Sequence, residues 1–267
     1  MIGPAVIGTD LVWLLAALCG VLVGFTLGLV GGGGSILAVP LMVYVVGVKN
    51  PHIAIGTSAL AVAANALAGL ANHARAGNVN WRCGGAYALA GVIGAFAGSS
   101  LGKAVDGQKL LFLFALLMLV VGGLMFRGRG NEGVEGVVCN RDNFPKVATF
   151  GFGTGMLSGF FGIGGGFLIV PGLVASTAMP VFRAVGTSLV AVSAFGLTTA
   201  FNYAVSGLVD WPLAGSFIVG GIAGSVIGTA ASRRLSAHKG RLTTVFAVLV
   251  VLVACYTLYR SYLALVG

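Results

Sequence analysis

Long apolar stretches alternate with short polar connections along almost the whole chain. A helix rises about 1.5 Å per residue, so about 20 apolar residues suffice to cross the roughly 30 Å hydrocarbon core of a bilayer. Most of the stretches reach about this length, and the pattern therefore predicts an all-α integral membrane protein. Each half of the chain has about five apolar segments, which cover roughly residues 11–30, 36–48, 53–76, 82–102 and 108–126 in the first half and 147–161, 167–179, 181–206, 212–232 and 242–263 in the second.

One segment in each half is short and follows a run of glycines. Residues 36–48 come after the run GGGGS at 31–35, and residues 167–179 come after the run GIGGG at 162–166. An unpaired backbone group in lipid costs several kcal/mol, so such a break is tolerated only where protein or a watery cavity surrounds it. Short, glycine-interrupted segments at matching positions in two halves point to the binding site of a transporter. We therefore expect two short helices, broken at these glycines, that span or re-enter the membrane.

The two halves also repeat one another in their glycine and polar positions. This agreement predicts a first transmembrane repeat over 1–126 and a second over 147–267, joined by a polar linker over 127–146 that lies in the cytoplasm. The strongest correspondences are G-x-x-x-G at 24–28 and 155–159, A-x-G-T-S at 54–58 and 184–188, and N-x-x-x-x-G-x-V-x-W at 72–81 and 202–211. Glycine ladders at 91–98 and 221–228 correspond as well, and we interpret them as faces for close helix packing.

The distribution of basic residues predicts how the two repeats are oriented. If each short segment contributes a second crossing or a re-entrant dip, a repeat has an odd number of crossings, and the second repeat is inverted relative to the first. With both termini outside, eleven of the 15 Lys and Arg residues lie inside and four lie outside, whereas the best parallel arrangement gives a near-even split. The positive-inside rule therefore favours an inverted repeat with the N- and C-termini outside.

Composition excludes several other classes of protein. Hydrophobic residues make up 58% of the chain and charged residues 8%, which rules out an ordinary soluble domain. The net charge of +9 lies in short connections, as membrane insertion requires, so we expect no nucleic-acid partner. The spans contain no paired carboxylates, no nucleophile–base pair and no metal-ligand cluster, so we expect no enzyme activity, no cofactor and no metal. The four cysteines are scattered, which predicts isolated small side chains rather than a metal or disulfide site.

The glycine breaks and nearby neutral polar residues suit a small anion. A helix that begins after a glycine break presents free N–H groups and a positive dipole end, and hydroxyl and amide groups add further donors. The alternative is that Ser and Thr bond to their own helix and the glycines only allow close packing. The candidate substrate-binding residues are Gly33, Gly34, Ser35, Thr57, Ser58, Asn72, Gly164, Gly165, Gly166, Thr187, Ser188 and Asn202, which we expect to line a site near the midplane.

Four further residues are candidates for access or gating. His73 and Arg75 lie in the last turn of their segment, Tyr203 replaces His73 in the second half, and Arg183 precedes the second G-T-S run. Interfacial placement is the commoner explanation for His73 and Arg75, and the positive-inside rule accounts for Arg183 equally well. A histidine proton relay, if present, would therefore exist in one half alone.

The glycine-rich breaks, the prolines that follow them at 40 and 171, the A-x-G-T-S segments and the repeated N-x-x-x-x-G-x-V-x-W together resemble the TauE/SafE sulfite exporter family. The resemblance covers nearly the whole chain. It implies a multi-pass carrier in the inner (plasma) membrane of a bacterium or archaeon, with a small sulfur-containing anion such as sulfite, sulfoacetate or another sulfonate as its substrate. The first break departs slightly, with four glycines and Ser35, which makes the two half-sites chemically unequal.

An exporter that works by alternating access is the function we expect. No Asp or Glu lies in the middle of a predicted span, so a buried carboxylate relay is absent from the sequence. An inside-negative potential of about 100 mV favours exit of a monoanion by roughly 2.3 kcal/mol, so export needs no coupling ion. The alternatives are an ion-coupled importer or facilitator of organic anions with the same fold, and a non-transporting membrane scaffold that recruits a soluble partner through 127–146.

Overall fold

The computed structural model describes residues 4–127, 143–234 and 239–266, and within these ranges all regular secondary structure is helical. The prediction of an all-α fold is confirmed. Most of the predicted linker, residues 128–142, lies outside the described residues. The elements are α1 (Pro4–Val30), η1 (Gly31–Leu37), α2 (Ala38–Tyr44), α3 (Pro51–Arg75), α4 (Trp81–Ala104), α5 (Gly107–Arg127), α6 (Phe144–Phe161), α7 (Gly166–Thr177), α8 (Val181–Val205), α9 (Trp211–Arg234) and α10 (Lys239–Val266).

Local sequence signals set several of the helix starts. Asn50 precedes Pro51 at the start of α3, and its side chain accepts the N–H of His52 at 2.9 Å. Asn80 caps α4 in the same way, through the N–H of Cys83 at 3.2 Å. Among the described residues, five helices are long and apolar enough to cross a membrane: residues 11–29 of α1, α3, α4, residues 183–205 of α8 and residues 211–231 of α9.

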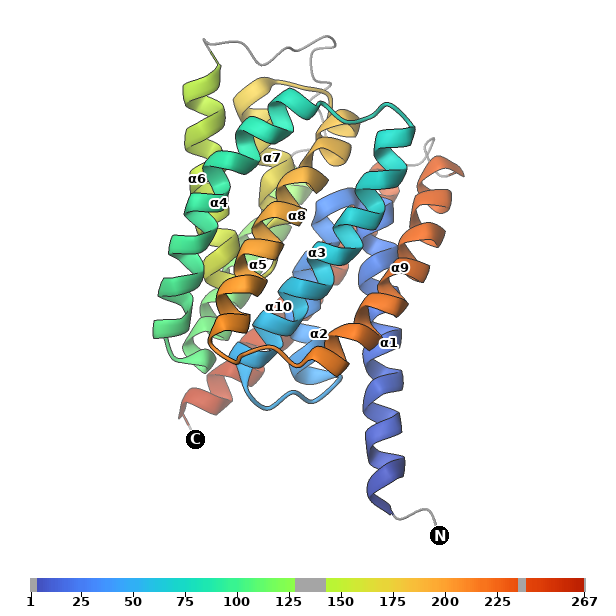
Figure 1. Cartoon of the computed structure of the whole chain (residues 1–267), viewed down its shortest axis with the longest axis vertical. Helices are drawn as coiled ribbons and strands as arrows, with labels where there is room; N and C mark the ends of the chain where they lie inside the picture. Colours follow the sequence, from blue (N-terminus) through green and yellow to red (C-terminus); the bar gives the residue numbers. More distant parts are fainter. Residues whose placement is uncertain (1–3, 128–142, 235–238, 267) are drawn as a thin grey trace.

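The helices of one half pack mainly against helices of the other half. The principal contacts join α1 to α9, α4 to α6, α3 to α8 and α5 to α10. Because α6 is the repeat counterpart of α1 and α9 that of α4, exchanging the two halves converts the first pair into the second. Figure 1 shows the same arrangement, with α1 beginning and α10 ending at the same end of the bundle.

The glycine ladders form the contacts of α1 with α9 and of α4 with α6. An added Cβ at Gly24 of α1 would overlap the carbonyl oxygen of Gly221 in α9, and one at Gly155 of α6 would overlap the carbonyl oxygen of Gly91 in α4. The backbones of the paired helices therefore approach to a distance that only glycine allows.

The cysteines follow the prediction only in part. Cys19 and Cys255 are free, as expected, whereas Cys83 is disulfide-bonded. Sequence spacing detects only local cysteine pairs, and folding brings distant ones together, so the scattered pattern did not indicate this bond.

Candidate functional site

The second glycine break is a sharp turn between two helices. α6 ends at Phe161, and Gly162, Gly164 and Gly165 have φ of 67°, 66° and 64° before α7 begins at Gly166. This left-handed conformation costs other residues about 1–2 kcal/mol, which explains the glycines. Gly165 occupies the N-cap position of α7 without a side-chain cap, and its carbonyl accepts the N–H groups of the next turn at 2.8 and 3.0 Å.

The first glycine break is built differently. Residues Gly31–Leu37 form a 3-10 helix that joins the end of α1 to α2, so no second free helix N-terminus exists here. Gly34 lies so close to α1 that an added Cβ would overlap Thr26 and the backbone of Leu27. Glycine tolerates helical and left-handed backbone alike, and packing of η1 onto α1 selects the helical form. The surroundings of Gly33 lie outside the described residues.

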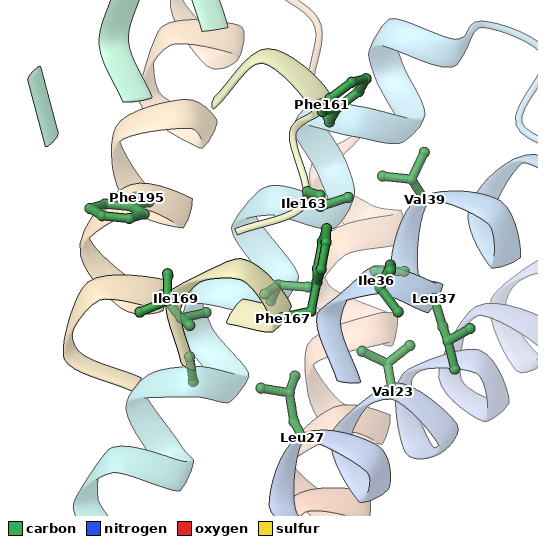
Figure 2. Close-up of a cluster of buried hydrophobic side chains, with 14 of the residues drawn as sticks. Val23, Leu27, Ile36, Leu37, Val39, Phe161, Ile163, Phe167, Ile169 and Phe195 are labelled. Carbon is green, nitrogen blue, oxygen red and sulfur yellow. The ribbon is translucent and has the colours of Figure 1, made fainter. Parts of the chain in front are cut away.

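The two breaks approach one another in the buried core, and Figure 2 shows Ile163 and Phe167 beside Ile36. Ile163 and Phe167 of the second break lie in one buried cluster with Ile36 of the first. Gly164 lies against α3 and α8, where an added Cβ would be 2.9 Å from Val62 and 3.4 Å from Val192. Buried apolar side chains of both elements therefore lie where the breaks approach one another.

Two serines are the polar groups closest to the breaks in the sequence. Ser35, in η1, is fully buried. Ser158, in the last turn of α6, is also fully buried, and an added Cβ on Gly165 would lie 2.6 Å from its hydroxyl oxygen. No described residue is a hydrogen-bond partner of the Ser158 hydroxyl. An unpartnered donor thus faces the N-terminus of α7, which is the arrangement that attracts an anion.

The predicted Thr-Ser pairs occupy a different kind of place. The Thr57 hydroxyl accepts the backbone N–H of Asp210, and the Thr187 hydroxyl accepts that of Asn80, each at 3.0 Å. Thr57 corresponds to Thr187 in the repeat, and the donor Asp210 corresponds to the donor Asn80. These contacts hold the start of α9 to α3 and the start of α4 to α8, so each A-x-G-T-S run contacts the N-x-x-x-x-G-x-V-x-W segment of the opposite half.

The serines of these pairs bond to their own helices. The hydroxyl of Ser58 donates to the carbonyl of Ile55 at 3.1 Å, and that of Ser188 to the carbonyl of Val185 at 2.7 Å. This is the local bonding that stood as the alternative to substrate binding.

The two Thr-Ser pairs lie near opposite ends of the bundle. Gly56 lies against Tyr203 and Gly186 lies against His73, so α3 and α8 run antiparallel. Thr187 is therefore level with a point about 15 residues beyond Thr57 on α3, which corresponds to ~22 Å at 1.5 Å per residue. This placement differs from the expectation of one midplane site lined by both pairs.

Asn202 takes part in a polar cluster at one end of α8. The Lys103 ammonium donates to the Asn202 side-chain oxygen at 2.8 Å, the Asn202 carbonyl at 3.0 Å and the Ser206 hydroxyl at 2.8 Å. The Asn202 amide nitrogen donates to the hydroxyls of Ser99 at 2.6 Å and Ser100 at 3.0 Å. The cluster ties the end of α4 to the end of α8.

The remaining candidates lie outside the centre. Tyr203 is fully buried, with the Lys103 ammonium 5.9 Å from its ring centroid. His73 is buried, Asn72 is partly buried, and Arg75 and Arg183 are exposed. Gly166 begins α7 and is buried.

Sequence reasoning missed two polar residues. Lys103 is one of the four basic residues that the predicted orientation places outside, and its repeat counterpart is the basic Arg233. Asn65 was missed in the middle of α3, where it is 1% exposed. A single amide inside an apolar span was the signal that could have found it, because polar groups at membrane depth mark functional sites.

A helical bundle with five membrane-length apolar helices and a buried glycine turn at its centre has the architecture of a multi-span transporter. Comparison with known proteins agrees. The model of the family described as "Sulfite exporter TauE/SafE" matches residues 16–257, so the chain belongs to this family of membrane transporters.

The relatives extend from bacteria to archaea. A probable membrane transporter protein of Xylella fastidiosa is 55% identical over 93% of this chain and 95% of its own length. The probable membrane transporter protein YunE of Bacillus subtilis is 24% identical over 93% of this chain and 98% of its own. MJ0441 of Methanocaldococcus jannaschii, also a probable membrane transporter protein, is 28% identical over 63% of this chain and 65% of its own. No solved structure matches the chain.

Proposed function

We propose that this transporter exports a small sulfur-containing anion, such as sulfite or a sulfonate, by alternating access. The anion binds where the two glycine breaks meet, beside the N-terminus of α7. The observation that carries the proposal is the buried Ser158 hydroxyl, which faces this N-terminus and has no partner among the described residues. Gly164, Gly165 and Gly166 supply the turn that lets an anion approach the backbone.

Charge at the centre supports an anion rather than a cation. Asp106 caps the start of α5 through two N–H groups at 3.1 Å, and Asp210 caps α9 at 3.1 Å. Both carboxylates thus lie at helix starts, where backbone N–H groups of their own helices partner them. In the described part of the chain no group of three or more His, Cys, Asp or Glu could hold a metal ion. The positive end of α7 presents partial positive charge to an anion at the turn.

Transport requires the apolar contact between the breaks to open. Ile36 of η1 is 1%, Ile163 0% and Phe167 5% exposed, so solvent does not reach the apolar contact between η1 and the second break. We infer that these side chains separate when either half moves, and that they close again behind the anion. Residues of the end clusters, including Thr57, Thr187 and Asn202, then act on access rather than on binding.

We further propose that the two repeats, 1–126 and 147–267, are inverted across the inner membrane, with both termini outside and 127–146 in the cytoplasm. The antiparallel packing of the repeat counterparts α3 and α8 supports the inversion, and the basic residues support the orientation. The disulfide at Cys83 favours the opposite orientation, because disulfides are rare in a reducing cytoplasm. Labelling of single cysteines at Lys49 and Arg75 with an impermeant thiol reagent in whole cells decides between them: reaction at position 49 alone supports this orientation.

An importer or facilitator with the same fold is the second candidate for direction and coupling. The dependence of flux on a proton or sodium gradient separates an ion-coupled importer from an uncoupled exporter. Saturation of the flux separates a carrier from a channel-like facilitator. The scaffold alternative predicts that neutralising the charges of 127–146 abolishes recruitment of the soluble partner. The transporter proposal predicts that the same variant keeps its anion flux.

Anion flux into proteoliposomes at a clamped potential tests the proposed function. Sulfite, thiosulfate, sulfoacetate and taurine are compared, with empty vesicles as the control. Saturable, electrogenic flux of one sulfur anion without a proton gradient is the expected result. Absence of flux for all four, with and without proton or sodium gradients, contradicts it.

A further inference from the structure

The two halves contain equivalent three-helix junctions. In one, α1 crosses α9 at Gly24 and Gly221, and an added Cβ on Gly221 would overlap the side-chain amide of Asn65 from α3. In the other, α6 crosses α4 at Gly155 and Gly91, and an added Cβ on Gly91 would overlap the ring of Phe195 from α8. The repeat places Asn65 and Phe195 at the same position, so an amide in the first half corresponds to a phenyl ring in the second.

The Asn65 junction contains polar groups without partners. Neither the amide nitrogen nor the amide oxygen of Asn65 has a hydrogen-bond partner among the described residues, and the side chain is 1% exposed. Ser225, one turn beyond Gly221 on the same helix, is also 1% exposed and has an unpartnered hydroxyl. Its counterpart at the other junction is the apolar Ala95 of α4.

Packing accounts for the Phe195 junction but not for the Asn65 junction. Phe195 is fully buried and stacks on Tyr87 with ring centroids 6.5 Å apart. A buried amide that makes no hydrogen bond destabilises a fold, and a leucine of nearly the same shape would avoid that loss. Buried polar groups left unpaired in a native protein call for a missing partner such as a water or a ligand.

The Asn65 junction adjoins the proposed binding region. Val62 of α3 contacts Gly164 in the turn before α7. Asn65 follows Val62 by three residues and therefore lies on the adjoining face of α3, one turn along. An anion beside the glycine turn is thus within one helical turn of an amide that can donate and accept.

We propose that Asn65, assisted by Ser225, contacts the transported anion and selects oxyanions that carry a proton. The amide nitrogen donates to a charged oxygen of the anion, and the amide oxygen accepts the O–H of a protonated form such as hydrogensulfite. A fully ionised sulfonate has no O–H for that second bond. The inference rests on the proposed function, and it makes the binding site asymmetric between the two repeats.

The test is the Asn65→Leu variant in proteoliposomes, with hydrogensulfite and methanesulfonate as the two probes and thermal unfolding in detergent as the second readout. The expected result is a KM for hydrogensulfite raised about tenfold or more, a smaller rise for methanesulfonate, and a Tm equal to or above that of the unaltered protein. A structural residue would instead show a lowered Tm with no change in the ratio of the two KM values.

Two matched controls frame the result. Phe195→Leu, at the equivalent position of the other junction, is expected to lower the Tm and leave both KM values unchanged. Thr26→Val removes a hydroxyl that bonds only to its own helix, at 2.9 and 3.0 Å, and is expected to change neither readout.

Each remaining outcome is decisive. Unchanged KM values with a raised Tm in Asn65→Leu mean that a water occupies the junction, and they overturn the inference while leaving the proposed function intact. Equal rises for both probes overturn the selection for a proton. Absence of flux in the unaltered protein contradicts the proposed function itself, and a direct binding titration of hydrogensulfite to the purified protein then decides whether Asn65 still contacts it.

Discussion

Each of two equivalent crossings joins the halves, backbone against backbone: α1 of the first half crosses α9 at Gly24 and Gly221, and α6 of the second half crosses α4 at Gly155 and Gly91. The third helix at each crossing differs between the halves. α3 contributes the unpartnered amide of Asn65 to one crossing, and α8 contributes the phenyl ring of Phe195 to the other. The glycine breaks diverge too, since one is a 3-10 helix and the other a left-handed turn. The repeat has kept the contacts that hold helices together and varied the groups that face the centre.

The largest expected effect tests what the two halves share. Gly24→Leu and Gly155→Leu each place a side chain where the partner carbonyl lies, so the crossing helices must separate. We expect either variant to lose several kcal/mol of stability, as overpacked and unsatisfied interiors do, and to yield little folded protein. Size-exclusion chromatography in detergent measures the yield of folded protein. A large loss from one variant but not the other would break the equivalence of the crossings.

The next effect tests where the halves differ. Gly164→Ala puts a methyl group on a left-handed residue that already lies against Val62, and we expect it to cost about 1–3 kcal/mol and to impair transport. Gly69→Ala is the control, because its added Cβ meets only Leu189 at 3.5 Å in a regular helix. The control is expected to be neutral or slightly stabilising. Thermal unfolding and sulfite flux are compared for both, and equal Tm values would contradict the turn geometry.

A smaller effect is expected at the cluster that joins the ends of α4 and α8. Lys103→Leu removes three hydrogen bonds from a partly buried ammonium, so Asn202 loses two of its contacts. We expect a loss of about 1–2 kcal/mol, at the lower part of the range for charged hydrogen bonds because solvent reaches the group. Lys103→Arg is expected to restore part of it. A Tm unchanged by the leucine would show that the cluster does not hold these ends together.

The smallest effects test the equivalence of the two ends. Thr57→Val and Thr187→Val each leave one helix-start N–H without its acceptor, at a cost of about 0.5–1.5 kcal/mol. Because the two sites lie ~22 Å apart along α3 and α8, the losses should add in the double variant. Chemical denaturation of the three variants measures this. Strong non-additivity would mean that the two ends are coupled through the bundle.

The sequence predicted the fold well because its signals are local. Apolar length gives the helices, Asn50-Pro51 gives a helix start that the structure confirms, and the glycine ladders give close packing. The glycine breaks were recognised from their unusual composition. Their difference in conformation was not, because glycine accepts both backbones and the choice depends on tertiary packing around Gly34 and Gly165.

The candidate site was harder to predict because tertiary packing decides which polar residues face it. Thr57 and Thr187 stand out in sequence because they repeat, yet the repeat maintains a contact between helix ends. Asn65 does not repeat, and so comparison of the halves draws attention away from it. In this duplicated chain the repeated threonines therefore make structural contacts between helices. The unrepeated polar residues are the ones to test first for a role in transport.

Anomalous X-ray scattering from crystals grown with selenite, the selenium analogue of sulfite, tests the central claim most directly. The account predicts one selenium peak per chain beside the Gly164–Gly166 turn, within hydrogen-bond distance of the Ser158 hydroxyl and the Asn65 amide. A peak at the Thr57 or Thr187 end alone, with the centre empty, would contradict it.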